Sequence, residues 1–83
     1  METRVAVISI IVENPDCTER INAILHEYRE YIIGRMGIPY KAKKIALISV
    51  AIDAPQDAIA ALSGKLGSMK GVSVKTAYSN IVG

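Results

Sequence analysis

The chain contains neither tryptophan nor phenylalanine, and it has only four tyrosines. Its core must therefore be aliphatic, and the sequence offers few rings on which nucleic-acid bases could stack. A single cysteine excludes an internal disulfide and is typical of a protein in a reducing cytosol. A single histidine likewise excludes a metal site built from several histidines of one chain.

Two further features are missing, a long apolar run and a strong net charge. No apolar stretch approaches the roughly 20 residues of a membrane-spanning helix, and no signal peptide opens the sequence. The net charge is only +2, divided into −3 for residues 1–34 and +5 for residues 35–83. We therefore expect a cytoplasmic domain that neither enters a membrane nor binds DNA directly.

What the sequence does contain is two segments, residues 4–12 and 44–52, that are apolar on both faces of a β-strand. A strand with one solvated face would alternate apolar and polar residues, so both faces of these strands need to be covered. A chain of 83 residues has enough material to cover one face. The sequence therefore predicts that a second copy covers the other, in a homodimer or a homotetramer.

The remaining pattern gives the order of elements. Asn14 followed by Pro15 suits a helix N-cap and first helical position. Helical spacing then joins the apolar residues of two stripes: Cys17, Ile21, Ile24, Leu25 and Tyr28 in the first, and Ala58, Ile59, Leu62 and Leu66 in the second. Further strands are expected at about residues 31–38 and 72–78, with a hairpin connection at 39–43.

This βαββαβ order predicts one ferredoxin-like α+β domain over residues 1–83. Its four-stranded antiparallel sheet would have the first and third strands at the centre and two helices on one face. The spacing does not decide which sheet face the helices cover. We place Ile8, Ile10, Ile48 and Val50 on the open face as the oligomer interface.

Three connections are expected to meet at one end of this fold, residues 13–17, 39–43 and 67–71. The first lies at a helix N-terminus, where free N–H groups favour an anion, and four lysines (41, 43, 44 and 70) add positive charge. Two interpretations stay open: a small effector bound near Asn14, Asp16 and Cys17, or an ordinary solvated loop end. Because Asp16 itself occupies the positive end of the helix, a ligand with an amino group, or with both signs as in an amino acid, fits better than a bare phosphate.

No combination of residues points to catalysis or to a bound cofactor. One His26 and one Cys17 per chain cannot complete a metal site without symmetry mates, so we expect no metal. The sequence has no Walker loop and no GxGxxG, and a lone histidine gives no recognisable catalytic triad. We therefore expect a protein that is not an enzyme.

Three segments, residues 24–28, 31–39 and 71–78, resemble the family called iron-only hydrogenase system regulators. That family in turn resembles the ACT-like C-terminal domain of nickel-responsive regulators. The resemblance implies an ACT-like domain that assembles by packing sheets, with a role near [FeFe]-hydrogenase maturation. The chain leaves no residues for the DNA-binding domain of the nickel regulators, and it lacks their set of histidines.

Together, the pattern and the resemblance indicate a homo-oligomeric regulatory module that binds a small effector or a regulatory protein. The alternative is a structural interaction domain that oligomerises and binds no ligand.

Overall fold

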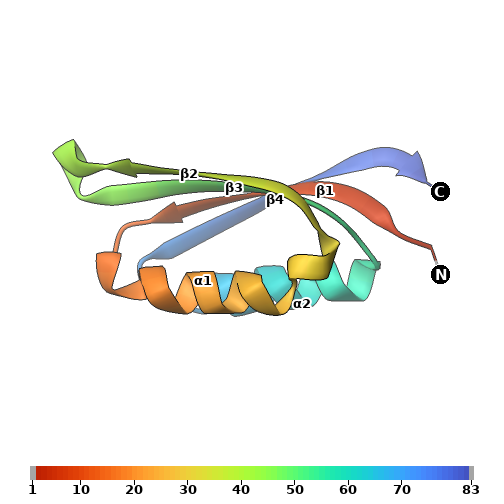
Figure 1. The fold of residues 1–83 in the computed structure, drawn as a ribbon, viewed down its shortest axis with the longest axis horizontal. Coiled ribbons are helices and arrows are strands. Elements are labelled where there is room, and N and C mark those ends of the chain that lie inside the picture. Colours follow the sequence, from red (N-terminus) through yellow and green to blue (C-terminus); the bar gives the residue numbers. More distant parts are fainter. Residues whose placement is uncertain (1, 83) are drawn as a thin grey trace.

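The computed structural model, which describes residues 2–82, places a four-stranded antiparallel sheet over two helices (Figure 1). The strands run in the order β2-β3-β1-β4, so that β1 and β3 are central. The elements are β1 (Arg4–Val12), α1 (Thr18–Glu27), β2 (Ile32–Tyr40), β3 (Ile45–Ala54), α2 (Gln56–Gly67) and β4 (Val72–Val82), with 3₁₀ turns η1 (Pro15–Cys17), η2 (Arg29–Tyr31) and η3 (Lys41–Lys43). The predicted ferredoxin-like fold is confirmed.

A 3₁₀ turn precedes the first helix. Asn14 caps η1, because its side-chain Oδ1 accepts the N–H of Asp16 at 3.1 Å, and Pro15 opens the turn. The α-helix proper begins only at Thr18 and buries Ile21, Ile24 and Leu25. The expected apolar stripe is present, and the expected cap serves the 3₁₀ turn.

The second helix starts after Pro55 and buries Ile59, Leu62 and Leu66. Its Lys65 reaches across to α1, where its ammonium group lies 3.4 Å from the Glu27 carboxylate. Tyr28 and then Glu27 raise the pKa of Lys65 above its ordinary value by hydrogen bonding to the charged ammonium. Lys65 and Glu27 are both exposed, so their ion pair joins the helices at the surface, whereas Tyr28 is half-buried and packs against the core.

The core lies between the sheet and the helices and takes the even-numbered residues of β1 and β3. Ile8, Ile10, Ile48 and Val50 belong to it, with 0–8% of their surface exposed. The prediction that these four residues form the open face is therefore wrong, because the helices cover the face on which they lie. The opposite face carries the odd-numbered residues of the same strands.

The sheet is longer than the helices and extends past them at both ends (Figure 1). Strands rise about 3.3 Å per residue and helices 1.5 Å, so strands of 9–11 residues outreach helices of 10–12. At one end the β2–β3 hairpin projects beyond the start of α1, and at the other the last residues of β4 project past α2. The tip of the hairpin consequently lies beyond the helix layer, while η1 and the start of α1 lie opposite its base.

Candidate functional site

Two of the three connections that were expected to meet are joined by hydrogen bonds at the loop-rich end. The Glu13 N–H donates to the Gly71 carbonyl at 2.7 Å. The Cys17 thiol donates to the Lys70 carbonyl with a sulfur–oxygen distance of 3.7 Å. These bonds hold the end of β1 and the turn η1 against the connection from α2 to β4.

The polar hollow is the depression that these two connections enclose, with a volume of about 400 Å³. Asn14, Asp16 and Cys17 all line it, so the structure brings the three predicted residues together. The other lining residues are Arg20, Ser68, Met69 and Lys70. The Asn14 Oδ1 and the Cys17 thiol already have partners within the chain. The hollow therefore offers a ligand charged groups of both signs, from Asp16, Arg20 and Lys70.

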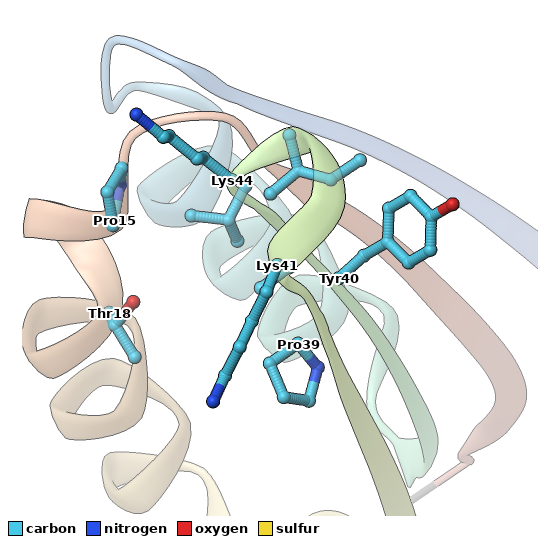
Figure 2. A pocket seen from close by; sticks show the side chains of 9 residues that line it. Pro15, Thr18, Pro39, Tyr40, Lys41 and Lys44 are labelled. Carbon is cyan, nitrogen blue, oxygen red and sulfur yellow. The ribbon is translucent and has the colours of Figure 1, made fainter.

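The third connection forms a different depression. The hairpin hollow, also about 400 Å³, lies between the β2–β3 hairpin and the segment that contains Pro15 and Thr18 (Figure 2). Its lining is almost entirely apolar. It consists of Val12, Pro15, Thr18, Pro39, Tyr40, Lys41, Lys44, Ile45 and Ala46. The lysines expected at one site are thus divided, because Lys70 lines the polar hollow while Lys41 and Lys44 line the hairpin hollow.

The two lysines approach the hairpin hollow from the hairpin side. Figure 2 shows the two side chains diverging, Lys44 past Pro15 and Lys41 in the opposite direction beside α1, so that their ammonium groups lie at opposite rims of the hollow. Lys44 is the one residue other than glycine with a positive φ, 55°, among residues 2–82. That conformation turns the chain from η3 into β3 and fixes where the Lys44 side chain starts.

The hairpin hollow was not predicted from the sequence. Pro15 and Thr18 lie about 25 residues before Lys41 and Lys44 along the chain, and only the projection of the hairpin brings them opposite one another. Strand β2 was expected to end near Ile38, whereas it continues to Tyr40. Those two additional residues give the hairpin its reach.

The sheet face away from the helices is a second candidate surface, which we call the open face. Its register places Ile38 opposite Leu47, and Leu47 opposite Ile11, in a row across β2, β3 and β1. The next row contains Ser49 and Ser9, which pair directly on the two central strands. Six large hydrophobic side chains on this face are 39–58% exposed: Val5, Val7, Ile11, Met36, Ile38 and Leu47.

A third hollow, of about 260 Å³, collects basic side chains between α1 and β2. His26, Arg29 and Arg35 line it together with Asn22, whose Oδ1 accepts a hydrogen bond from the Arg35 guanidinium at 2.8 Å. Arg29 donates to the carbonyl of His26 at 3.0 Å. Arg35 is thus held against α1 by a hydrogen bond to Asn22.

Residues 2–82 contain no group of three or more His, Cys, Asp or Glu side chains placed to hold a metal ion. Neither α1 nor α2 has the length and apolarity that a membrane-spanning helix requires.

Comparison with known proteins agrees with this geometry. A solved structure of the uncharacterised protein TM1266 from Thermotoga maritima is similar, with a TM-score of 0.87 and 35% sequence identity over 92% of this chain and 96% of that one. A formyltetrahydrofolate deformylase from Pseudomonas putida KT2440 has a TM-score of 0.67 at 16% identity, over 93% of this chain and 29% of its own length. The second likeness concerns the ACT-like fold alone. No curated protein matches the chain significantly.

A family model described as "TM1266-like: Iron-only hydrogenase system regulator, putative" matches residues 4–76. This match includes all of α1, α2 and the first three strands, and it agrees with the similarity to TM1266 along nearly the whole chain. The chain therefore belongs to the TM1266-like family of iron-only hydrogenase system regulators.

Proposed function

We propose that this chain is a non-enzymatic, homo-oligomeric regulatory module of the iron-only hydrogenase system, with a second copy covering the open face. The observation that carries the proposal is the row Ile38, Leu47 and Ile11, which lies on the sheet surface with no helix over it. Six large hydrophobic side chains on one face exceed the scattered apolar residues usual on a monomer. The family match supports the regulatory part of the proposal.

The energetics favour a copy of the chain as the cover. Complete burial of a large aliphatic side chain contributes roughly 1.5–3 kcal/mol, and these side chains still have about half of that gain available. In a twofold dimer both copies use the same surface, so each of these residues is buried in both copies and its contribution to association counts twice. The Ser9 and Ser49 side chains are small, so they allow two such faces to approach closely.

The regulatory activity would then depend on a ligand or a partner protein. We propose the polar hollow, around Asn14, Asp16 and Cys17, as the place where a small effector binds. Its mixed charges from Asp16, Arg20 and Lys70 suit a ligand that carries both signs, as an amino acid does. We place the protein in the cytoplasm, because a lone half-buried cysteine suits a reducing compartment.

Sedimentation velocity at micromolar concentration tests the oligomer. We expect the wild-type chain to sediment as a dimer or tetramer, and Leu47→Lys to sediment as a folded monomer. Ala61→Lys is the matched control, because it adds the same charge on an exposed position of α2 and should leave the assembly intact. A wild-type chain that is monomeric and well folded would contradict the proposal.

Thermal-shift screening tests the effector. Amino acids, nucleotides and divalent metals would be screened, since a ligand at 100 times its Kd stabilises the native state by about 2.7 kcal/mol. We expect a hit whose stabilisation is lost in Asn14→Ala and in Asp16→Ala. A hit that survives both substitutions would place the site elsewhere. Absence of any hit would favour the alternative, an oligomerising interaction domain without a ligand.

A further inference from the structure

We propose that the hairpin hollow is a binding site for a small organic acid, a carboxylate attached to an apolar body. This inference rests on the proposed role as an effector-binding module, but on a different hollow and on different residues. It is independent of the oligomer.

The size and lining of the hollow suit such a ligand. Small-molecule sites usually measure about 300–1,000 Å³ and combine apolar walls with a few convergent polar groups. The hairpin hollow measures about 400 Å³, and Val12, Pro39 and Ala46 contribute apolar walls from three strands. Water in such a space would have few hydrogen-bond partners, so an apolar ligand body gains by replacing it.

The charge of the hollow selects the sign of the ligand. Its three polar side chains are Thr18, Lys41 and Lys44, and no carboxylate lines it. The single ion pair within residues 2–82 is the distant Lys65–Glu27 pair, so both hairpin lysines keep their charge available. A carboxylate at either rim would accept a charge-assisted hydrogen bond from the ammonium group there, and the Thr18 hydroxyl is a further donor on the helix side.

The way the hollow is built keeps these groups opposite one another. Lys41 and Lys44 are joined by the turn η3, in which the Lys44 N–H donates to the Lys41 carbonyl at 3.2 Å. Thr18 is the first residue of α1, and Pro15 is the first residue of η1. The two sides are separate elements, so a ligand between them would link the hairpin to the helix layer.

Binding of octanoate, with octylamine and octanol as matched probes, tests the proposal. In ¹⁵N-labelled protein we expect octanoate to shift, saturably, the amide resonances of Thr18, Lys41, Lys44 and Ala46. Octylamine should leave them unshifted, and octanol should bind at least tenfold more weakly. In calorimetric titrations, the double variant Lys41→Ala, Lys44→Ala should raise the octanoate Kd by about tenfold, because it removes the ammonium group at both rims.

Lys43→Ala is the control for general charge, because Lys43 lies in the same turn and does not line the hollow. It should leave the octanoate Kd within twofold of wild type. Ala46→Leu should fill the hollow and abolish octanoate binding, and thermal unfolding would show that this variant remains folded.

Four outcomes would overturn the proposal. They are equal binding of octylamine, equal weakening by Lys43→Ala, shifts confined to the open face, and dissociation of the oligomer by octanoate, which would mean that a second copy occupies the hollow. A monomeric wild-type chain that binds octanoate as described would instead refute the proposed oligomer and leave this site standing.

Discussion

Gly71 is a residue whose backbone and surroundings both exclude a side chain. Its φ is +83°, a conformation that residues with a Cβ adopt only at a cost. A Cβ built there would lie 2.8 Å from the Cβ of Asn14, well inside normal contact distance. Glycine at this position therefore permits the close approach of the two connections that enclose the polar hollow.

We expect Gly71→Ala to lower the free energy of unfolding by about 1–3 kcal/mol, through backbone strain and displacement of Asn14. Gly64→Ala is the matched control, since Gly64 is exposed within α2 and a Cβ there meets nothing within 4 Å. It should raise the free energy of unfolding by about 0.5–1 kcal/mol. Urea denaturation measures both, and a neutral Gly71→Ala would show that the connection adjusts freely.

Within β1, two neighbouring isoleucines have different roles. Ile10 lies in the core with 1% of its surface exposed, whereas Ile11 lies on the open face with 43% exposed. A strand turns successive side chains to opposite faces, so one substitution tests the fold and the next tests the assembly.

Ile10→Ala should lower the free energy of unfolding by about 2–5 kcal/mol, the usual cost of a large-to-small change in a core. This loss of unfolding free energy, relative to wild type, should not depend on protein concentration. Ile11→Ala should instead weaken association, so its loss of unfolding free energy relative to wild type should be largest at low protein concentration, where the oligomer dissociates. Urea titrations over a hundredfold range of concentration would separate the two, and identical concentration dependence would contradict the assignment of faces.

Several elements could be predicted from the sequence because their patterns are local. The run at residues 4–12 coincides with β1, and Ala58, Ile59, Leu62 and Leu66 share the α2 stripe. β1 is apolar on both of its faces, so periodicity alone did not reveal which face packs on the helices. A signal was nevertheless present, because Ser9 and Ser49 both point to the face that the helices leave open.

The hairpin hollow could not be predicted in the same way. It depends on how far β2 and β3 project past α1, which is set by two residues at the end of β2 and by a left-handed conformation at Lys44. A lysine gives no local indication of that conformation, which glycine or asparagine would have given. The polar hollow was easier to predict from the sequence, because Asn14 and Asp16 are close along the chain and belong to one turn.

For the whole molecule, charge and helix packing argue against specific recognition of DNA. The net charge of +2 is small. Both helices bury an apolar stripe, Ile21, Ile24 and Leu25 in α1 and three residues of α2, against the sheet. A helix that reads the major groove must project from the protein and present base-contacting side chains. Both helices here lie flat against the sheet, so we do not expect either to enter the groove.

We therefore expect the purified protein not to retard an operator fragment in the presence of competitor DNA at physiological salt. Weak retardation that competitor DNA removes would be ordinary electrostatic attraction to the phosphates. Sequence-specific retardation that resists competitor would contradict the prediction and indicate a reading surface outside the helices.

The position of β1 between β3 and β4 also has a consequence for synthesis of the chain. Strand β1 is among the most apolar, yet it leaves the ribosome before both of its neighbours in the sheet, β3 and β4. At roughly 5–20 residues per second, several seconds separate the appearance of β1 from that of β4. Throughout that interval β1 has two unpaired edges and two exposed apolar faces, so the nascent chain is open to aggregation until β3 and β4 have been made.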